Sequence, residues 1–284
     1  MAIKLSPSEQ LTYSTVRIEC ELNSGGIGTG TGFFYRFAKK GEQFVPAIVT
    51  NKHVVNETNK GLIHLNLADD TGNPLTAQFF SVVIENMQSS WILHPDPDVD
   101  LCIMPIAPLL NELQSHGKRM FFISLDHSLV PTTELLNDLT AIEDVIMIGY
   151  PNGIWDKINN RPIVRKGITA THPRLDYNGK QEFMIDAACF PGSSGSPVFL
   201  FNLGSYASRD GGTVIGSRIA LLGVLYAGPQ HTATGEVKII DVPTQQRSFA
   251  FSLIPNNLGI VIKSKKLGDF DPILEEFLQR QADT

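Results

Sequence analysis

The sequence predicts an all-β protein built from many short strands. Short apolar or alternating runs recur along the chain as far as about residue 265, and most of the 24 glycines and 17 prolines fall between them. This rhythm is typical of a β-barrel or β-sandwich, whereas strands alternating with long helical segments would predict a parallel sheet. Hydrophobic residues make up 42% of the 284 residues and charged residues 18%, so the chain can build a packed core.

The strand-like segments can be followed in chain order. The first covers residues 16–22, where apolar and polar side chains alternate as they do in a half-buried strand. Further strands are predicted at residues 32–37, 45–50, 62–67, 101–106, 145–149, 195–200, 219–225 and 259–262. Residues 107–140 break this series with segments typical of short helices or turns, so we place there the link between two half-domains.

The C-terminal end of the chain has the pattern of a helix. Asp271 can cap a helix and Pro272 suits its first turn, which predicts a helix over residues 272–282. Its apolar stripe, which should pack on the body of the protein, consists of Ile273, Leu274, Phe277 and Leu278. Residues 202–218 are rich in glycine and serine and are predicted to form a mobile surface loop.

Charge and hydropathy argue against several classes of function. The 23 basic and 29 acidic side chains give a formal net charge of −6, so nothing favours binding to nucleic acid or to an anionic membrane surface. No apolar run reaches the roughly 18 residues of a membrane-spanning helix. The segment that begins with Met1 has no apolar run, so we expect no secretory signal.

The cysteines predict a reducing compartment. Cys20, Cys102 and Cys189 are few, odd in number and without paired spacing, which indicates free thiols and a cytoplasmic location. The chain contains no C-x-x-C or H-E-x-x-H motif, so we expect no metal site and no cofactor.

Three segments carry residues with the chemistry of amide hydrolysis. His53 follows an apolar strand, Asp100 opens another, and Ser194 lies in a tight turn of small residues just before a third. A serine hydroxyl becomes a useful nucleophile when a base removes its proton, and histidine titrates near neutral pH. An aspartate can hold the imidazole in one tautomer and stabilise its charged form, so these residues are candidates for a catalytic triad.

The glycine before this serine has a separate role. Without a side chain at Gly192, the backbone N–H groups of Gly192 and Ser194 can converge on one point. That point is where a carbonyl oxygen becomes negative during attack, so the two amides are the candidate oxyanion hole.

Four motifs resemble the trypsin-like, or chymotrypsin-like, serine protease superfamily, and among its members the HtrA (Deg) type in particular. They are T-N-K-H-V-V at residues 50–55, D-A-A-C-F-P-G-S-S-G-S-P at 186–197, G-T-G-T-G-F at 28–33 and I-G-Y-P-N-G at 148–153. The order histidine, aspartate, serine along the chain is also that of the chymotrypsin-like proteases. The resemblance covers about residues 25–265.

This resemblance implies a fold and an organisation. It implies a chymotrypsin-like double β-barrel, two six-stranded barrels with the active site in the groove between them. We therefore expect residues 1–284 to form a single trypsin-like peptidase domain without a PDZ domain. Its N-terminal barrel would cover about residues 10–110, its linker about 107–140 and its C-terminal barrel about 141–265, followed by the C-terminal helix at about 272–282.

Two positions depart from the family pattern. Ser193 stands where the family has Asn or Asp, and Ser196 stands where it usually has Gly. In zymogen-type trypsins, a new terminal ammonium pairs with an aspartate just before the catalytic serine. Because Ser193 has no charge to offer, we expect activity without cleavage of the N-terminus.

Two members of the candidate triad, the aspartate and the serine, have competitors nearby. Asp96 and Asp98 lie in the same loop as Asp100, but Asp100 is favoured because it stands at the start of the strand. Ser193 competes with Ser194 as nucleophile, and the family register favours Ser194. Cys189 lies near the site and is interpreted as a pocket wall and not as a second nucleophile.

The predicted specificity pocket is uncharged. In the family register, its walls and the edge that pairs with an extended substrate come from Ala187, Ala188, Cys189, Gly223, Val224, Leu225 and Tyr226. Cleavage after Lys or Arg needs a carboxylate at the pocket base, because an unpaired buried cation is costly. The pattern therefore predicts a serine endopeptidase that cleaves polypeptide substrates after small or medium apolar residues through an acyl-enzyme.

An alternative function stays open on the same fold. The chain could be a catalytically silent pseudoprotease that holds a peptide in its groove, since fold alone does not guarantee activity. A protease in the cytoplasm also needs control, so we expect regulation by loops or by a protein partner.

Overall fold

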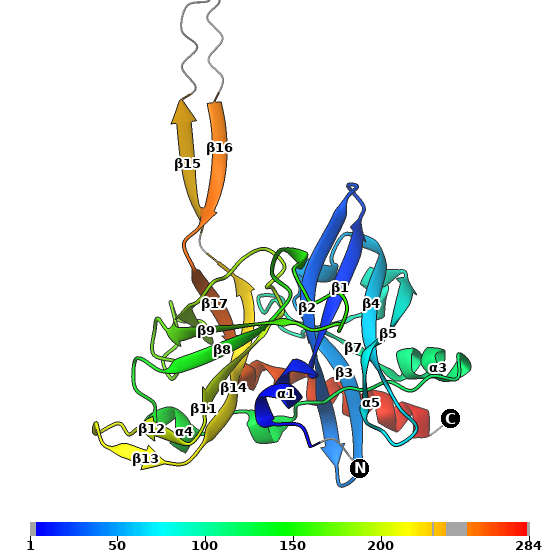
Figure 1. Cartoon of the computed structure of the whole chain (residues 1–284), viewed down its shortest axis with the longest axis horizontal. Coiled ribbons are helices and arrows are strands. Elements are labelled where there is room, and N and C mark those ends of the chain that lie inside the picture. The colour runs from blue at the N-terminus through cyan, green and yellow to red at the C-terminus, as the bar shows by residue number, and fades with distance from the viewer. Residues whose placement is uncertain (1–3, 229, 237–248, 283–284) are drawn as a thin grey trace, which may run out of the picture.

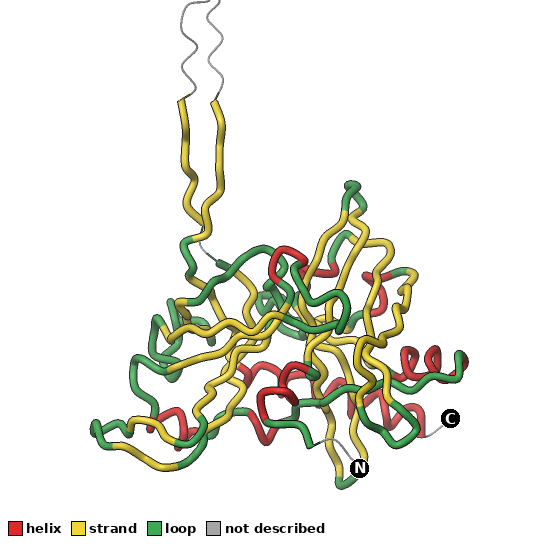
Figure 2. The backbone as a smooth tube through the Cα atoms, in the orientation of Figure 1, coloured by secondary structure: helices red, strands yellow, loops and turns green. Residues whose placement is uncertain are grey.

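Strands make up most of the molecule in the computed structural model, which describes residues 4–228, 230–236 and 249–282 (Figure 1). They gather in two groups, one from the first part of the chain and one from the second, and the helices between and around them are short (Figure 2). The predicted all-β, chymotrypsin-like class with a C-terminal helix is confirmed.

The N-terminal group is a seven-stranded antiparallel sheet. Its strands are β1 (Thr15–Leu22), β2 (Ile27–Lys40), β3 (Gln43–Thr50), β4 (Thr58–Ala68), β5 (Pro74–Glu85), β6 (Ile92–Leu93) and β7 (Cys102–Pro105). Their hydrogen-bonded order is β5-β4-β1-β2-β3-β7-β6, so the sheet has one strand more than the six expected. The apolar runs of the sequence predicted five of these seven strands, and the two that they did not predict are β5 and the two-residue β6.

The C-terminal group is a closed barrel of six strands, as predicted. The strands are β8 (Asp144–Gly149), β9 (Ile163–Thr169), β10 (Glu182–Asp186), β11 (Pro197–Asn202), β14 (Arg218–Ala227) and β17 (Leu258–Lys263). They close in the order β10-β17-β14-β11-β8-β9. Closure leaves no unpaired edge. Strand β11 is apolar on both faces because Val198 and Leu200 pack in the barrel core, whereas Phe199 packs in the core that the barrel shares with the N-terminal half.

Two further hairpins leave the barrel. One pairs β12 (Ser205–Ala207) with β13 (Thr213–Ile215), within the segment expected to be a loop. The other pairs β15 (Gln230–Glu236) with β16 (Phe249–Pro255) and projects away from the barrel as a two-stranded ribbon (Figure 1).

Short helices fill the connections. They are α1 (Pro7–Thr12), α2 (Lys52–Val55), α3 (Ala107–Ser115), α4 (Thr133–Asp138) and α5 (Asp271–Ala282), with 3₁₀ turns η1 (Met87–Ser90), η2 (His127–Leu129), η3 (Pro151–Gly153) and η4 (Ser264–Phe270). The region expected to link the two halves contains α3, η2 and α4.

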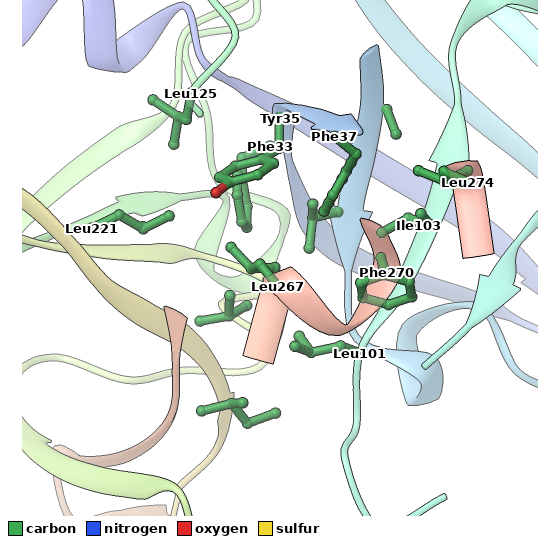
Figure 3. Close-up of a cluster of buried hydrophobic side chains, with 14 of the residues drawn as sticks. Phe33, Tyr35, Phe37, Leu101, Ile103, Leu125, Leu221, Leu267, Phe270 and Leu274 are labelled. Atoms are coloured by element: carbon green, nitrogen blue, oxygen red, sulfur yellow. The ribbon is translucent and has the colours of Figure 1, made fainter. Parts of the chain in front are cut away.

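One apolar core joins the two halves. Strand β2 is buried on both faces, so Phe34 packs inside the N-terminal sheet while Phe33, Tyr35 and Phe37 point to the other side. There they meet residues of the barrel and of the C-terminal segment (Figure 3). The labelled partners are Leu101, Ile103, Leu125, Leu221, Leu267, Phe270 and Leu274. This shared core fixes the two halves against each other and so forms the base of any site between them.

The C-terminal helix begins one residue earlier than predicted, and its expected cap is wrong. Asp271 has helical backbone angles, because η4 runs directly into α5. Its carboxylate accepts hydrogen bonds from Ala38 N at 2.7 Å and from His127 Nε2 at 2.6 Å. Leu274 is fully buried as expected, whereas Leu278 is 38% exposed and the side chain of Phe277 lies outside the described residues.

Candidate active site

His53 is placed by strand β3, which ends at Thr50, just before it. The last residues of β3 are buried, and the single-turn helix α2 follows directly and carries His53. Its side chain is 47% exposed, in contrast to the fully buried Asn51 two residues earlier. The local sequence therefore anchors the backbone and leaves the imidazole accessible.

The structure brings His53 and Asp100 together. The Nδ1 atom of His53 lies 2.5 Å from Asp100 Oδ2, and the His53 backbone N–H donates to Asp100 Oδ1 at 3.1 Å. The Asn51 side chain donates to the Asp100 carbonyl at 2.7 Å, which fixes the loop that carries the aspartate. With Nδ1 held by the carboxylate, Nε2 is the nitrogen left for proton transfer.

Of the two competing aspartates, Asp96 is engaged elsewhere. Asp96 Oδ1 accepts the backbone N–H of Asp98 at 3.0 Å, and Asp96 Oδ2 lies 3.6 Å from Lys266 Nζ. These contacts hold Asp96 in a loop turn away from the imidazole. Among the three candidates in this loop, Asp100 is the one whose carboxylate contacts His53.

Ser194 is tied to the N-terminal sheet through its backbone. Thr31 N–H donates to the Ser194 carbonyl at 2.9 Å, and Thr50 Oγ1 donates to the Thr31 carbonyl at 2.7 Å. Gly195 has φ 84°, and an added Cβ there would overlap the Thr31 carbonyl oxygen, so a side chain does not fit. The Ser194 hydroxyl donates to the Tyr226 carbonyl at 3.5 Å, and within the described residues no hydrogen bond joins it to His53.

The residues before Ser194 form a type II β-turn. Ser193 N–H donates to the Phe190 carbonyl at 3.0 Å, Pro191 occupies the second position, and Gly192 has φ 84° at the third. The Pro191 carbonyl accepts Asn152 N–H at 2.5 Å. Because a trans peptide points its C=O and N–H in opposite directions, this bond directs the Gly192 N–H to the other face of the turn.

A second bond holds the next carbonyl of the turn. Thr31 Oγ1 donates to the Gly192 carbonyl at 3.0 Å and accepts the Tyr150 N–H at 3.0 Å. In the part of the chain that the structure describes, the N–H groups of Gly192 and Ser194 have no hydrogen-bond partner. Two unpaired amides beside an accessible serine can stabilise an oxyanion. The roles of Thr31 and Asn152 were missed in the sequence, although both lie in motifs that it singles out.

The predicted pocket residues are largely buried and apolar. Ala187 and Cys189 pack with Leu225 in the core of the barrel. A Cβ added at Gly259 would lie 2.6 Å from Cys189 Sγ and within contact of Ile185, so apolar side chains fill the space over this glycine. Gly259 and Ile185, which the sequence did not single out, thus lie beside the predicted pocket residues.

Strand β14, which carries the other predicted substrate-binding residues, has less backbone free to pair with a substrate than the sequence led us to expect. The backbone of Gly223, Val224 and Leu225 pairs with β17, and Gly223 and Val224 also pair with β11. We therefore revise the predicted substrate-binding edge, because a substrate strand cannot replace these ladders. Tyr226 remains at the serine through its carbonyl.

The Tyr226 phenol contacts Glu182, a buried acidic residue of the barrel. Its hydroxyl donates to Glu182 Oε1 at 3.0 Å. Burial raises the pKa of Tyr226, and the negative charge of Glu182 adds to the effect, so the phenol stays neutral and donates.

The described residues contain no cluster of three His, Cys, Asp or Glu side chains that could hold a metal ion. No helix among them is long and apolar enough to span a membrane. All three cysteines are buried, free thiols.

Fold and candidate site together define a class of protein. A closed six-stranded barrel beside an antiparallel sheet, with His53, Asp100 and Ser194 where they meet, is the architecture of a chymotrypsin-like peptidase. Residues 30–206 match the family model of the trypsin-like peptidase domain. The chain belongs to this family of peptidases.

Solved structures with a similar shape are proteases. The active form of the Rv3671c protease from M. tuberculosis is 15% identical, with 95% of this chain and 88% of that chain covered and a TM-score of 0.42. The HtrA-type protease AlgW with tripeptide is 15% identical, with 90% and 58% covered and a TM-score of 0.46. Deg5 is 18% identical, with 79% and 88% covered and a TM-score of 0.41. No curated protein matches the sequence.

Proposed function

We propose that this peptidase is a serine endopeptidase that cleaves polypeptides through an acyl-enzyme on Ser194. The observation that carries the proposal is the type II turn at residues 190–193, which leaves the Gly192 and Ser194 amides unpaired beside the serine. A protein that only held peptides would have no need for two amides aimed at a developing negative charge.

The proposed reaction assigns one role to each group. Ser194 Oγ attacks the substrate carbonyl carbon while His53 Nε2 takes the hydroxyl proton, and Asp100 stabilises the imidazolium through Nδ1. The oxyanion accepts hydrogen bonds from the Gly192 and Ser194 amides. His53 then gives its proton to the leaving amine, and water hydrolyses the resulting ester by the same route in reverse.

The present contact of Ser194 is compatible with this role. A hydrogen bond of 3.5 Å to the Tyr226 carbonyl is weak, so the hydroxyl can exchange it for His53 when a substrate binds. Catalytic hydrogen bonds are often loose before the substrate is present.

A fluorophosphonate probe tests the nucleophile directly. We expect stoichiometric labelling of the wild-type protein at Ser194, and Ser194→Ala should lose labelling and at least about 10⁴-fold of its peptidase activity. His53→Ala should also lose activity, because the serine then has no base. Ser205→Ala, at an exposed serine of β12, is the matched control and should behave as wild type.

The result also separates the two functions considered for this fold. Folded wild-type protein that the probe leaves unlabelled would rule out the serine mechanism and favour a pseudoprotease that holds peptides. Labelling that survives in Ser194→Ala would assign the nucleophile to another residue.

We further propose that cleavage follows small or medium apolar residues. Cys189 and Leu225, two of the residues assigned to the pocket, pack with Ile185 in an apolar cluster, and such surroundings favour an apolar side chain and offer no negative charge for a basic one. A peptide library should therefore show Val, Ala, Leu and Met ahead of Phe at the position before the cut. A dominant preference for Lys, Arg, Asp or Glu would contradict this proposal.

A further inference from the structure

Arg165 points from the barrel toward the turn that precedes the serine. On β9, the alternate residues Val164, Lys166 and Ile168 are exposed, so Arg165 lies on the opposite face of the strand. Its Nη1 atom donates to the Ala188 carbonyl at 2.5 Å and to Ser193 Oγ at 2.8 Å. One guanidinium nitrogen thus contacts a residue before the turn and the last residue of the turn.

Arg165 has no acidic partner among the described residues that would account for its buried position. Within the described residues, Arg165 forms no ion pair, and its Nε and Nη2 atoms are buried without a hydrogen-bond partner. Burial lowers the pKa of Arg165 to about 10, so the guanidinium is still charged at neutral pH. A buried cation without a counter-ion costs stability, and such costs are concentrated at functional sites.

The Ser193 hydroxyl links the Arg165 guanidinium to the first residue of the turn. Its side chain is buried, and Ser193 Oγ accepts the Phe190 N–H at 3.3 Å in addition to Arg165. Hydrogen bonds from a charged donor are stronger than those between neutral groups. Arg165 therefore fastens the two ends of the turn, Phe190 and Ser193, from the barrel side.

Asn152 fastens the same turn from the other side, through the Pro191 carbonyl. A type II turn and a type I turn differ by a flip of the central peptide, here the bond between Pro191 and Gly192. A flip would point the Pro191 carbonyl, instead of the Gly192 N–H, at the oxyanion position. The active geometry depends on contacts that oppose this flip.

We propose that Arg165 is a positioning residue that locks the turn at residues 190–193 in the type II form, so that the Gly192 amide faces the substrate carbonyl. The cation comes from within the barrel, so the turn needs no charge generated by cleavage of the chain. This inference rests on the proposed function, because the turn matters for catalysis only if Ser194 attacks a carbonyl.

Kinetics of Arg165 variants test the effect on catalysis. Arg165→Met keeps the apolar stem and removes the charge, and we expect kcat to fall about 10²–10³-fold, as for loss of an oxyanion donor, with little change in KM. Arg165→Lys keeps a charged nitrogen that can donate to both acceptors, but its flexible stem lacks the rigid planar guanidinium, so it should recover only part of this loss. Lys166→Ala, the exposed neighbour on the same strand, is the matched control.

Chemical rescue separates positioning from a general loss of stability. In Arg165→Ala, added methylguanidinium should restore part of kcat, because a small cation can refill the space between Ala188 and Ser193. A variant that was merely unstable would gain nothing from the cation, and that result would overturn the proposal.

Hydrogen exchange provides a readout that needs no activity. The Asn152 amide is protected by the Pro191 carbonyl only while the turn is type II. In the Ser194→Ala background, Arg165→Met should therefore accelerate exchange at Asn152 by at least about 10-fold, whereas Lys166→Ala should not. Unchanged exchange and unchanged kcat in Arg165→Met would refute the lock.

The two proposals fail in different ways. If the wild-type protein is not labelled by a fluorophosphonate but Asn152 exchange still depends on Arg165, the lock is correct and the serine mechanism is wrong. If the wild-type protein is labelled and Arg165→Met equals it in kcat and in exchange, the serine mechanism stands and the lock is wrong.

Discussion

Cys189 lies five residues before Ser194, and an ionised thiol is a stronger nucleophile than a hydroxyl. The Cys189 side chain is 8% exposed and packs with Ala187 and Leu225 in the barrel core. Burial raises its pKa to about 11. At neutral pH the thiol is therefore protonated, which argues against a rival nucleophile, and its role as a pocket wall stays a prediction.

The pKa of Cys189 predicts slow alkylation of the folded protein. At pH 8, a pKa raised from 9.0 to about 11 lowers the thiolate fraction about 100-fold, so iodoacetamide should modify Cys189 at least that much more slowly than an exposed thiol. The rate should increase as the pH approaches 11. Because the folded state holds the proton more tightly than the unfolded state, Cys189 should also make folding less stable as the pH rises above about 9.

Mass spectrometry can measure modification at each cysteine separately. Cys20, whose pKa burial raises to about 12, should react slowly as well, and denaturant should make both react quickly. Fast modification of Cys189 in folded protein at pH 7 would contradict the predicted burial effect.

Single residues differ in how much the sequence reveals about them. His53 and Asp100 could be predicted because each stands at the end of an apolar strand, and they meet at 2.5 Å. Arg165 could not, since an arginine in an alternating run normally faces water and only the barrel shows which face is inside. Asn152 was equally hidden, because its role depends on a backbone N–H that carries no side-chain signal.

At the scale of elements, apolar periodicity located most strands, and tertiary context set their ends. Strand β4 was predicted at residues 62–67 and extends over Thr58–Ala68, because its pairing with β1 and β5 continues past the apolar run. Strand β5 was missed because it lies at the edge of the sheet, where only Val82 is buried and the other positions are exposed or half-buried, so its apolar residues show no regular alternation.

The C-terminal helix shows the same division between local and tertiary effects. Its apolar spacing predicted the helix correctly, whereas the expected Asp271 cap failed because the carboxylate contacts Ala38 and His127 instead. Capping depends on the backbone angles of one residue, and the 3₁₀ turn that precedes α5 sets those angles. Here a contact far along the chain outweighed a local preference.

The whole molecule depends on how its two halves meet, which no local pattern describes. The core between them combines residues of β2, the barrel and α5 that are far apart in sequence (Figure 3). Asp271 adds hydrogen bonds that join α5 to the N-terminal sheet and to His127 in the connection between the halves. Since His53 and Ser194 come from different halves, this core also helps to set the distance between the proposed base and the proposed nucleophile.

Two leucines of α5 differ in burial and so allow a test of how much this helix contributes to the core. Leu274 is fully buried against the core that joins the halves, whereas Leu278 is 38% exposed. Leu274→Ala should lower the free energy of unfolding by about 2–5 kcal/mol, because it removes buried methyl groups and leaves a cavity. Leu278→Ala should change it by less than about 0.5 kcal/mol. Urea unfolding followed by circular dichroism measures both values, and the dependence on urea should keep its slope.

Equal effects of the two substitutions would mean that α5 does not pack on the body as the structure describes. A loss of peptidase activity in folded Leu274→Ala, without change in Leu278→Ala, would further indicate that the helix holds the two halves at the spacing that His53 and Ser194 require.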